Sequence, residues 1–388
     1  MTGGIAIYKA VDLMRTLIKK GAQVQVAMTP AACEFVSPLL FEKLSKHEVL
    51  VDTFTESHPE TVAHIDFATH ADFAIVAPAT ANTLAKMAHG LADNMVTSAL
   101  LATTCPIFTV PAMNENMYQH PATQENITTL ANRGVYLITP DRGFLAEGYE
   151  GQGRFPEKER IVEEFEVFVR NHLANLPLAD KKVLITAGGT QEALDPVRVL
   201  TNRSSGKMGH ALATAAFYAG AEVTLVTASA LPVHSGIKTI RTTSARDMYR
   251  KVAEFFDTTD VLIMAAAVSD YYVKNRSDQK MKKKGAVTLE LAENPDILKA
   301  MGQKKKDQFV IGFAAETEHL ETYAAKKLAE KNLDAIIANS VAKKTSGFDV
   351  DENAGVLMTA AGSVQEFSVM SKQQMAEEII DYIANQLD

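Results

Sequence analysis

The sequence predicts an α/β protein of two domains, each built on a parallel sheet with helices on both faces. The chain has 388 residues, more than one hydrophobic core usually serves. Short apolar runs alternate along it with stretches of helical periodicity. This alternation restarts after residues 174–182, a charged segment with a proline that is typical of a linker. We therefore expect domains at residues 1–175 and 180–388.

The first half contains three runs that predict buried strands and two that predict helices. The strands are QVQVAMT (23–29), DFAIVAPAT (72–80) and PIFTVPAMN (106–114), and the helices are Tyr8–Lys20 and Asn82–His89. TGGIA (2–6) is typical of a turn that follows a buried first strand, but only Met1 precedes it. We expect this strand to be absent from the chain or dispensable to the domain.

The second half repeats the pattern. Strands are expected at KVLITAGGT (182–190), AEVTLVTAS (221–229), DVLIMAAAVSD (260–270), QFVIGFAAET (308–317) and LDAIIANS (333–340), with a helix at Lys207–Tyr218. The glycine turns of both halves suit phosphate, because glycine lets backbone N–H groups approach an anion. A simple tight turn explains them equally well, since neither matches the dinucleotide or Walker A pattern.

Composition limits the function further. The net charge of −8 argues against non-specific nucleic-acid binding. Cys33 and Cys105 are the only cysteines, which excludes a disulfide framework and favours a reducing, cytoplasmic location. No apolar run is long enough for a transmembrane helix, and no signal peptide is expected at the N-terminus.

Polar residues at strand ends are the first candidates for a site, because ligands of parallel sheets bind there. Thr80, Asn82 and Thr83 follow one strand and Asn114 follows the next, although helix capping explains the first group equally well. In the second half, TNRSSGKMG (201–209) opens a helix and suits an anion. Asp270 is expected to end a buried strand a few residues before the lysines of KMKKKG (280–285), an arrangement that suits a nucleoside triphosphate with Mg²⁺.

Taken in order, the motifs resemble a known family of bifunctional coenzyme A biosynthesis proteins. These fuse phosphopantothenoylcysteine decarboxylase to phosphopantothenate–cysteine ligase. The resemblance covers essentially the whole chain and rests on TGGIAIYK, APATANTLAK, PAMNENMY, TAGGTQEALDPVR, TNRSSGKMG, AAAVSDY, KMKKKG, ENPDIL and GFAAET. It implies two Rossmann-like three-layer domains, an N-terminal flavoprotein and a C-terminal ligase, in an oligomer: trimers of the first, dimers of the second, together a dodecamer.

For the first half the resemblance implies that FMN oxidises the substrate's cysteine thiol to a thioaldehyde, CO₂ leaves, and the flavin re-reduces the product to 4′-phosphopantetheine. His64 matches the family's active-site histidine, and Asn114 and Met117 match its substrate-binding motif. The implied FMN-binding residues are Gly3, Gly4, Ile5, Thr29, Thr80, Ala81, Asn82, Thr83 and Ala112.

For the second half it implies that 4′-phosphopantothenate reacts with CTP to give an acyl-cytidylate, from which cysteine displaces CMP. Asn202 would contact this intermediate, Lys280 would stabilise charge on the transferring phosphate, and Asp270 would bind Mg²⁺. The implied CTP-binding residues are Met264, Ala265, Ala266, Asp270, Lys280, Glu293, Asn294, Pro295, Phe313, Lys327 and Lys331. The preference for CTP over ATP rests on the family alone.

One residue departs from the family at the expected flap over the flavin, GFLAEGYEGQGRFPE (143–157), whose glycines predict a loop. Glu147 stands where the family has a proton-donating cysteine. A solvated carboxyl group is ionised at neutral pH and cannot donate a proton, whereas a buried one keeps it. The alternative is therefore a ligase whose first half is a non-catalytic flavin-binding or assembly module.

Overall fold

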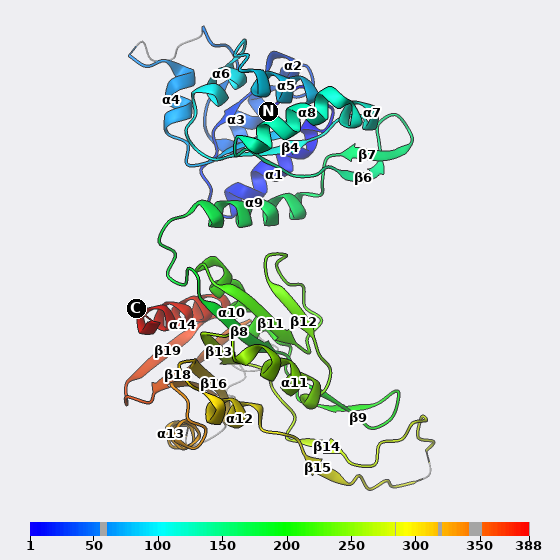
Figure 1. Cartoon of the computed structure of the whole chain (residues 1–388), viewed down its shortest axis with the longest axis vertical. Helices are drawn as coiled ribbons and strands as arrows, with labels where there is room; N and C mark the ends of the chain where they lie inside the picture. The colour runs from blue at the N-terminus through cyan, green and yellow to red at the C-terminus, as the bar shows by residue number, and fades with distance from the viewer. Residues whose placement is uncertain (55–59, 284, 317–319, 341–350, 388) are drawn as a thin grey trace. The chain divides into compact units, whose positions relative to one another are not determined.

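In the computed structural model the chain forms two compact units, Met1–Leu173 and Ala174–Asp388, and residues 1–54, 60–283, 285–316, 320–340 and 351–387 are described. Each unit consists of strands that alternate with helices, which confirms the predicted α/β class. No helix within these ranges is both long and apolar enough to span a membrane. Figure 1 shows both units, and each is described below by itself.

The first unit has a parallel three-stranded sheet, β3-β4-β5, and a separate parallel pair, β1-β2. Its elements are α1 (Ile7–Lys19), β1 (Val26–Ala27), α2 (Pro30–Cys33), α3 (Pro38–Ser45), β2 (Val49–Leu50), α4 (Ala63–Thr69), β3 (Ala74–Ala79), α5 (Ala81–His89), α6 (Met95–Ala102), β4 (Ile107–Pro111), α7 (Glu115–Gln119), α8 (Pro121–Asn132), β5 (Tyr136–Leu137), β6 (Asp141–Phe144), β7 (Glu150–Arg154) and α9 (Lys158–His172).

Alternation along β3 divides its side chains between two layers of helices. Ala77 faces a cluster that includes Leu13 of α1 and Ile161 of α9. Val76 faces a second cluster that includes Leu84 of α5. This two-sided burial explains why the strand is apolar at nearly every position, as its sequence predicts.

The N-terminal residues run between the two small sheets. The Met1 amine donates to the carbonyl of Ala27 at 2.7 Å, and the amide of Thr29 donates to the Met1 carbonyl at 3.1 Å. On the other side, the Thr2 hydroxyl donates to Pro78, at the end of β3. The run expected as a strand at 23–29 forms only the two residues of β1. The expectation of an absent first strand stays a prediction.

The second unit is organised around one sheet of the order β12-β11-β8-β13-β16-β17-β18-β19. The first six strands in this order pair in parallel, and β18 and β19 are added by antiparallel pairing. Its elements are β8 (Lys182–Ala187), β9 (Gln191–Ala193), β10 (Val199–Thr201), α10 (Lys207–Tyr218), β11 (Glu222–Thr227), β12 (Lys238–Arg241), α11 (Ala245–Phe256), β13 (Val261–Met264), β14 (Tyr271–Val273), β15 (Leu291–Glu293), α12 (Ile297–Lys304), β16 (Phe309–Glu316), α13 (Leu320–Glu330), β17 (Ala335–Ser340), β18 (Glu352–Thr359), β19 (Val364–Ser371) and α14 (Lys372–Leu387).

The two faces of this sheet are again covered by different helices. On one face α11, α12 and α13 contribute to a common core, which contains Leu184 of β8 and Leu262 of β13. On the other face α10 packs on β8 and against α14. A Cβ at Gly209 of α10 would lie 2.5 Å from the Cβ of Ala187, so glycine is required for this close packing. The helix Lys207–Tyr218 has the bounds that the sequence predicts.

Two short hairpins, β9-β10 and β14-β15, lie beside each other away from this sheet. The strand expected at 260–270 ends already at Met264, and the residues after it lead into β14. Asp270 therefore does not end a buried strand but is an exposed residue just before a hairpin. The prediction was wrong because residues 265–268 extend the apolar run but form only an isolated bridge, between Ala267 and Gly189, and no strand.

Candidate functional site

Three turns of the first unit meet where its strands end. The Thr2 hydroxyl donates to the carbonyl of Pro78 at 2.7 Å and accepts the amide of Thr80 at 3.2 Å. A Cβ at Gly3 would lie 2.5 Å from the Cβ of Ala31, so a larger residue at this position would force the turns apart. The first glycine turn therefore lies against the residues that follow β1 and β3.

Several predicted FMN residues occupy these turns and also shape them. The Thr29 hydroxyl caps α2, and the Thr80 hydroxyl caps α5 through the amide of Thr83 at 3.3 Å. The amide of Ala112 donates to Ala79, which brings the end of β4 to the same edge. The capping interpretation is thus correct for Thr80, and it does not exclude a ligand at the same edge.

The geometry of this edge fits an anionic group. Helix α1 begins after Ala6 without a side-chain cap, and its Ile7 and Lys9 amides already donate to backbone carbonyls. Among the described residues, the amides of Ile5 and Ala6 just before the helix have no acceptor, so they remain available to an anion. A Cβ at Gly4 would lie 3.3 Å from Cγ2 of Thr80, which leaves a narrow space that glycine keeps open. Ile5 is 62% exposed beside it, and Asn82 is exposed while Ala81 is half-buried. A phosphate with an apolar ring system attached would suit this mixture of amides and apolar surface.

The glycine-rich segment at 143–157 is a β-hairpin and not the loop that its composition predicts. Strand β6 pairs antiparallel with β7, and the turn between them is closed by a bond from the amide of Leu145 to the carbonyl of Tyr149 at 2.8 Å. Gly148 has φ of +90° within this turn. Glycine at pleated positions is uncommon, because it has no side chain to pack, which is why composition alone suggested a loop.

The base of the hairpin is fixed to the segment after β4. The amide of Met113 donates to the carbonyl of Gly153 at 3.0 Å, and the amide of Gln152 donates to the carboxylate of Glu115 at 3.1 Å. A Cβ at Gly153 would lie 2.0 Å from the Met113 carbonyl oxygen. Only glycine allows the two backbones to come this close.

The turn of the hairpin carries two side chains back to Asn114. The Asn114 amide nitrogen donates to Oε1 of Glu147 at 3.0 Å and to the hydroxyl of Tyr149 at 2.9 Å. All three side chains are accessible to solvent. Glu147, the residue that departs from the family, therefore contacts the predicted substrate-binding residue directly.

His64 and Met117 are less closely connected to this group. His64 is half-buried on α4, and its Nδ1 has no hydrogen-bond partner among the described residues. Helix α4 packs on α6, and the hydrogen bonds given for the described part of the unit do not join His64 to the three turns. Met117 lies on α7 with 51% of its surface exposed. Their predicted roles stay predictions.

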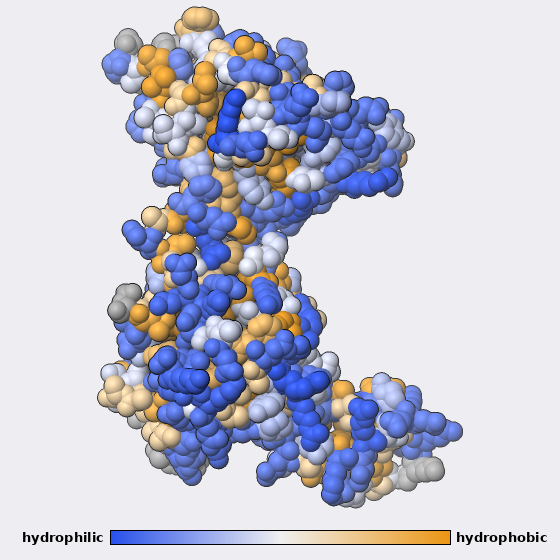
Figure 2. All heavy atoms as spheres, in the orientation of Figure 1, coloured by the Kyte–Doolittle hydropathy of each residue, from blue (hydrophilic) through white to orange (hydrophobic). Residues whose placement is uncertain are grey.

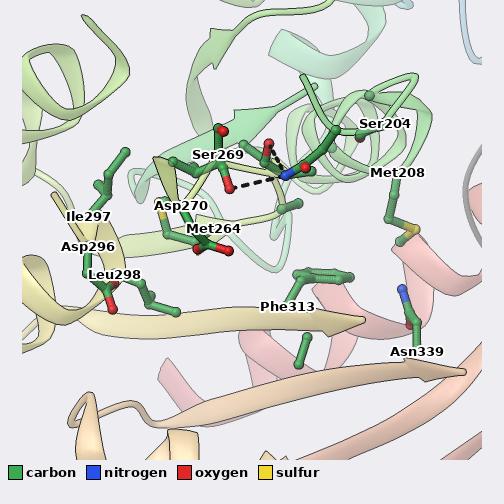
Figure 3. Close-up of a pocket in the computed structure, with 18 of the residues that line it drawn as sticks. Ser204, Met208, Met264, Ser269, Asp270, Asp296, Ile297, Leu298, Phe313 and Asn339 are labelled. Atoms are coloured by element: carbon green, nitrogen blue, oxygen red, sulfur yellow. Dashed lines mark hydrogen bonds between the residues drawn. The ribbon is translucent and has the colours of Figure 1, made fainter. Parts of the chain in front are cut away.

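The second unit has a cavity of about 580 Å³ at the carboxyl ends of β13, β16 and β17 (Figure 3). Its wall contains every residue predicted for the ligase site except Lys280. The lining residues among those predicted are Asn202, Met264, Ala265, Ala266, Asp270, Glu293, Asn294, Pro295, Phe313, Lys327 and Lys331. These positions are separated by up to 129 residues in the sequence (331 − 202).

Side-chain amides shape one wall of the cavity. Asn202 donates to the carbonyls of Ala267 at 3.4 Å and Val268 at 3.2 Å. Asn294 donates to Ser269 at 3.0 Å, while its Oδ1 is buried without a partner among the described residues. An unsatisfied buried acceptor costs free energy, so a donor on a bound ligand would stabilise this wall.

The N-terminus of α10 forms another part of the wall. The helix begins at Gly206, which has φ of +84° and gives no side-chain cap. A Cβ there would lie 2.7 Å from the Cβ of Ser229, so glycine is needed for both reasons. Ser204 and Ser205 precede it in the cavity wall. The Lys207 amide donates to the Ser205 hydroxyl at the long distance of 3.5 Å. A helix N-terminus with adjacent hydroxyls suits a phosphate or carboxylate.

The TAGGT turn, in contrast, has a packing role. Gly188 has φ of +84°, and a Cβ on it would lie 2.7 Å from the Ser229 amide nitrogen. A Cβ on Gly189 would lie 2.7 Å from the carbonyl oxygen of Asn202. None of residues 186–190 is among those that line the cavity. The tight-turn interpretation therefore explains these glycines.

Two lysines and a carboxylate lie at the far side of the cavity. Lys327 and Lys331 both line it, and the Lys331 amide donates to the Lys327 carbonyl, although α13 itself ends at Glu330. The Lys331 ammonium lies 2.9 Å from Oδ2 of Asp296. Burial alone would raise the pKa of Asp296, but the amide of Lys299 and the ammonium of Lys331 outweigh it and hold that pKa below its ordinary value.

Asp270 lines the cavity as an exposed carboxylate, and its carbonyl accepts the amide of Asn294 at 2.8 Å. Within the described ranges, no three His, Cys, Asp or Glu side chains gather as metal ligands. A single carboxylate with open positions is nevertheless how Mg²⁺ is often held together with substrate phosphates. Asp270 thus fits an ion that arrives with a nucleotide better than one bound by protein alone.

Lys280 does not lie in the cavity wall. It is exposed in the segment that joins β14 to β15, as are Lys282 and Lys283, and Lys284 is outside the described residues. The sequence predicted that Asp270 and this lysine cluster belong to one nucleotide site, but in the structure Asp270 lines the cavity and Lys280 does not.

Three polar residues of the cavity were missed by the sequence analysis. Lys372 is 7% exposed and Asn353 is 2% exposed, and both line the cavity with Asn339. Nothing in their local sequence distinguishes them from surface residues, because their burial depends on how β17, β18 and α14 meet. A buried lysine is uncommon unless it is paired. The hydrogen bond from Lys207 lowers the pKa of Asp351, and the charge of Lys372 helps to lower it.

Comparison with known proteins covers both units. Residues 1–170 match the family described as Flavoprotein, and residues 178–387 match the DNA/pantothenate metabolism flavoprotein C-terminal domain. The chain is 48% identical over 390 residues to the coenzyme A biosynthesis bifunctional protein CoaBC of Bacillus subtilis (strain 168), with 99% of this chain and 95% of that protein covered. The protein of the same name from Vibrio vulnificus (strain CMCP6) is 41% identical over 388 residues, covering 99% and 96%.

Among solved structures, the C-terminal domain of a coenzyme A biosynthesis bifunctional protein CoaBC is 40% identical. The similarity covers 55% of this chain and 98% of that one, with a TM-score of 0.48.

Proposed function

The chain belongs to the family of bifunctional coenzyme A biosynthesis proteins, and on this premise we propose how its two units divide the chemistry. The second unit joins 4′-phosphopantothenate to cysteine with CTP, and the first decarboxylates the product to 4′-phosphopantetheine with FMN. Similarity to a bifunctional protein along 99% of the chain favours two activities over a ligase alone. The free cysteines support the proposed cytoplasmic location.

One observation carries the ligase assignment: the cavity gathers residues that a nucleotide and an activated carboxylate would need. Carboxylates are poor electrophiles. Attack of the substrate's carboxylate oxygen on the α-phosphorus of CTP releases pyrophosphate and gives an acyl-cytidylate, from which the amine of cysteine displaces CMP. The side-chain amide of Asn202 is proposed to hold the acyl group, and the ammonium groups of Lys327 and Lys331 are proposed to attract the nucleotide. Asp270 is proposed to receive Mg²⁺, which would neutralise phosphate charge.

For the decarboxylase the support is the edge where the three turns meet. The amides just before α1 and the hydroxyls of Thr29 and Thr80 are proposed to hold the phosphate of FMN. Bound FMN supplies two-electron oxidation of the substrate thiol and its reversal. Asn114 is proposed to bind the substrate's carboxylate end, with the hairpin closing over it. Glu147 stands at the proton donor's position, and its exposure supports a slow final protonation.

Self-association is proposed as well. The β9-β10 and β14-β15 hairpins expose six large apolar side chains, which would be covered in a dimer of ligase units: Val197, Val199, Tyr271, Val287, Leu289 and Leu291. Some of this apolar surface is visible in Figure 2. The trimer of flavoprotein units and the dodecamer stay predictions from the family.

A coupled assay tests the proposal. The full chain is incubated with 4′-phosphopantothenate, cysteine, CTP and Mg²⁺, and each product is identified by mass. We expect the cysteine conjugate, CMP and pyrophosphate, followed by 4′-phosphopantetheine. Replacing CTP by ATP tests nucleotide preference, and flavin absorbance of the purified protein tests FMN. A conjugate that accumulates on a protein without flavin would support the ligase-only alternative instead.

A further inference from the structure

The segment that carries Lys280 is tied at two points to the turn between β9 and β10. The amide of Ser277 donates to the carbonyl of Leu194 at 3.0 Å. Four residues later, the amide of Met281 donates to Oδ2 of Asp195 at 3.1 Å. The second contact involves the residue that directly follows Lys280, so it restrains the backbone from which this lysine extends.

Asp195 is the centre of the attachment. Its side chain has no exposed surface, although it lies in a turn at the edge of the unit. Oδ1 accepts the amides of Val197 and Arg198, each at 2.8 Å, and Oδ2 lies 3.0 Å from Nη2 of Arg198. The same guanidinium nitrogen donates to the Met281 carbonyl at 2.5 Å. Both backbone groups of Met281 are therefore held by one carboxylate–guanidinium pair.

Burial of the Asp195 carboxylate costs free energy unless its lone pairs accept hydrogen bonds. Burial alone would raise the pKa of Asp195, but the three amides and the charge of Arg198 outweigh it and lower that pKa, so the group stays ionised at neutral pH. Charge-assisted hydrogen bonds of this kind are stronger and more directional than neutral ones. The Asp195–Arg198 pair therefore fixes the position of the Met281 backbone.

The turn also connects to the cavity along the chain. Strand β10 leads from Arg198 through Val199–Thr201 directly to Asn202, which lines the cavity. Asn202 is held in turn by the carbonyls of Ala267 and Val268. A short, hydrogen-bonded path thus joins the cavity wall to the backbone beside Lys280, whose side chain is itself exposed and outside the wall.

We propose that Asp195 is a positioning residue for ligation, which sets the reach of Lys280 toward the cavity by holding the Met281 amide. This rests on the proposed function, in which Lys280 acts on the transferring phosphate. Asp195 is not proposed to touch a substrate. A misplaced transition-state contact lowers the rate of the chemical step and leaves nucleotide binding largely unchanged.

The test compares Asp195→Asn with wild type in the full chain. The amide keeps the size of the side chain but loses its charge and one acceptor oxygen. We expect kcat for ligation to fall about 10- to 100-fold, as displacement of a reacting group by about 1 Å can do, while KM for CTP stays within about twofold. Asp278→Asn is the matched control, because Asp278 is an exposed acid in the same segment, and it should change neither value.

A double-mutant cycle with Lys280→Ala gives the decisive readout. If Asp195 acts through Lys280, adding Asp195→Asn to Lys280→Ala produces no further loss of kcat. An equal loss in both backgrounds, or a wild-type kcat for Asp195→Asn alone, would overturn the proposal. If Asp195→Asn no longer binds CTP in a titration, Arg198→Met replaces it in the same cycle. It removes the guanidinium, and with it the link to the Met281 carbonyl and the ion pair with Asp195, but keeps the carboxylate that accepts the Met281 amide.

Failure of the proposed function has a different signature. A wild-type chain that makes no conjugate refutes the ligase assignment before any variant is made. A Lys280→Ala variant that ligates at the wild-type rate refutes the role of Lys280, and with it the positioning role of Asp195, in a single measurement that does not involve Asp195.

Discussion

The side-chain amide of Asn114 donates to the carboxylate of Glu147 at 3.0 Å, across 33 residues of sequence. The bond joins the end of the β4 strand region to the tip of the β6-β7 hairpin. It places an exposed carboxylate where the family has a thiol, in contact with the residue proposed to bind the substrate. Glu147 is thus in contact with the residue proposed to bind the substrate, which supports a role for it in the proposed decarboxylase site.

The first prediction concerns this position. Glu147→Cys should raise the rate at which 4′-phosphopantetheine is completed, because a thiol at neutral pH carries the proton that an exposed carboxylate has lost. General acid catalysis is commonly worth about 10²–10⁴ in rate, so a gain of at least about tenfold is expected. The product is followed by mass after addition of the cysteine conjugate.

Glu150→Cys is the control, because Glu150 is exposed at the start of the neighbouring strand and has no contact with Asn114 among the hydrogen bonds described. If wild type already completes the reaction as fast as Glu147→Cys, another group supplies the proton.

The second prediction separates backbone strain from lack of space within the hairpin. Gly148 has φ of +90° with nothing within 4 Å of an added Cβ, whereas Gly153 combines φ of +144° with a Met113 carbonyl oxygen 2.0 Å away. Gly148→Ala should cost about 1–2 kcal/mol, the usual penalty for a left-handed residue. Gly153→Ala should cost more than about 3 kcal/mol or detach the hairpin from Met113.

Denaturant unfolding and limited proteolysis at 145–149 measure the two effects. Equal losses of unfolding free energy in both variants would show that the Met113 carbonyl moves away from the added Cβ at little cost.

The third prediction is a pH dependence at the Asp296–Lys331 pair. The pKa of Asp296 is held below its ordinary value of 3.8, so its contribution to stability is complete above about pH 4 and is lost as pH falls through the lower, folded-state pKa. Asparagine also caps helices well, so Asp296→Asn removes mainly the charge. We expect it to lower the free energy of unfolding by at most about 1 kcal/mol at pH 7, since the pair is partly exposed.

The difference between wild type and Asp296→Asn should shrink as the pH is lowered from 5 toward about 2.5 in urea titrations. Asp257→Asn is the control: it breaks an exposed ion pair with Lys304 and measures how much the loss of an ordinary surface pair changes the free energy of unfolding. A difference that grows toward low pH would contradict the assignment.

The fourth prediction tests Lys280 itself. Lys280→Gln should lower ligation about 10²–10³-fold, the usual loss of one transition-state charge contact, with an unchanged circular dichroism spectrum. Lys283→Gln, an exposed lysine of the same segment, should retain activity. Near-normal ligation by Lys280→Gln would remove Lys280 from the mechanism.

The sequence was most informative where strands are buried on both faces. The run 333–340 predicted the bounds of β17, Ala335–Ser340, to within two residues. Parallel strands between two helical layers are apolar at almost every position, which makes them easy to recognise. The antiparallel strands β18 and β19 were not predicted, although they pair with each other across a short connection, because their buried and exposed residues alternate only partly. Strand β1 has only two residues, and the run expected there, QVQVAMT (23–29), is interrupted by two glutamines, unlike the runs of β3 and β4.

The candidate site shows the same division. Residues of ordered motifs, such as Asn202 and Phe313, converge on one cavity. Lys372 and Asn353 had no motif around them, and their burial depends on tertiary packing alone. The chain-distant attachment of Met281 to Asp195 could not be predicted either, because a side chain that bonds to backbone amides leaves no pairing pattern in the sequence.

The base of the β6-β7 hairpin is held by backbone atoms, through the Met113 amide and the Gly153 carbonyl, whereas its tip meets the rest of the unit through side chains. Libraries of variants can therefore be confined to Glu147 and Tyr149, whose side chains are exposed, so that new side chains change the chemistry offered to a substrate while the backbone of the hairpin is kept. Selection can exchange one proton donor for another at this tip while the glycines beneath it stay fixed. The tip of the hairpin can therefore change its chemistry by substitution while the backbone at its base stays the same.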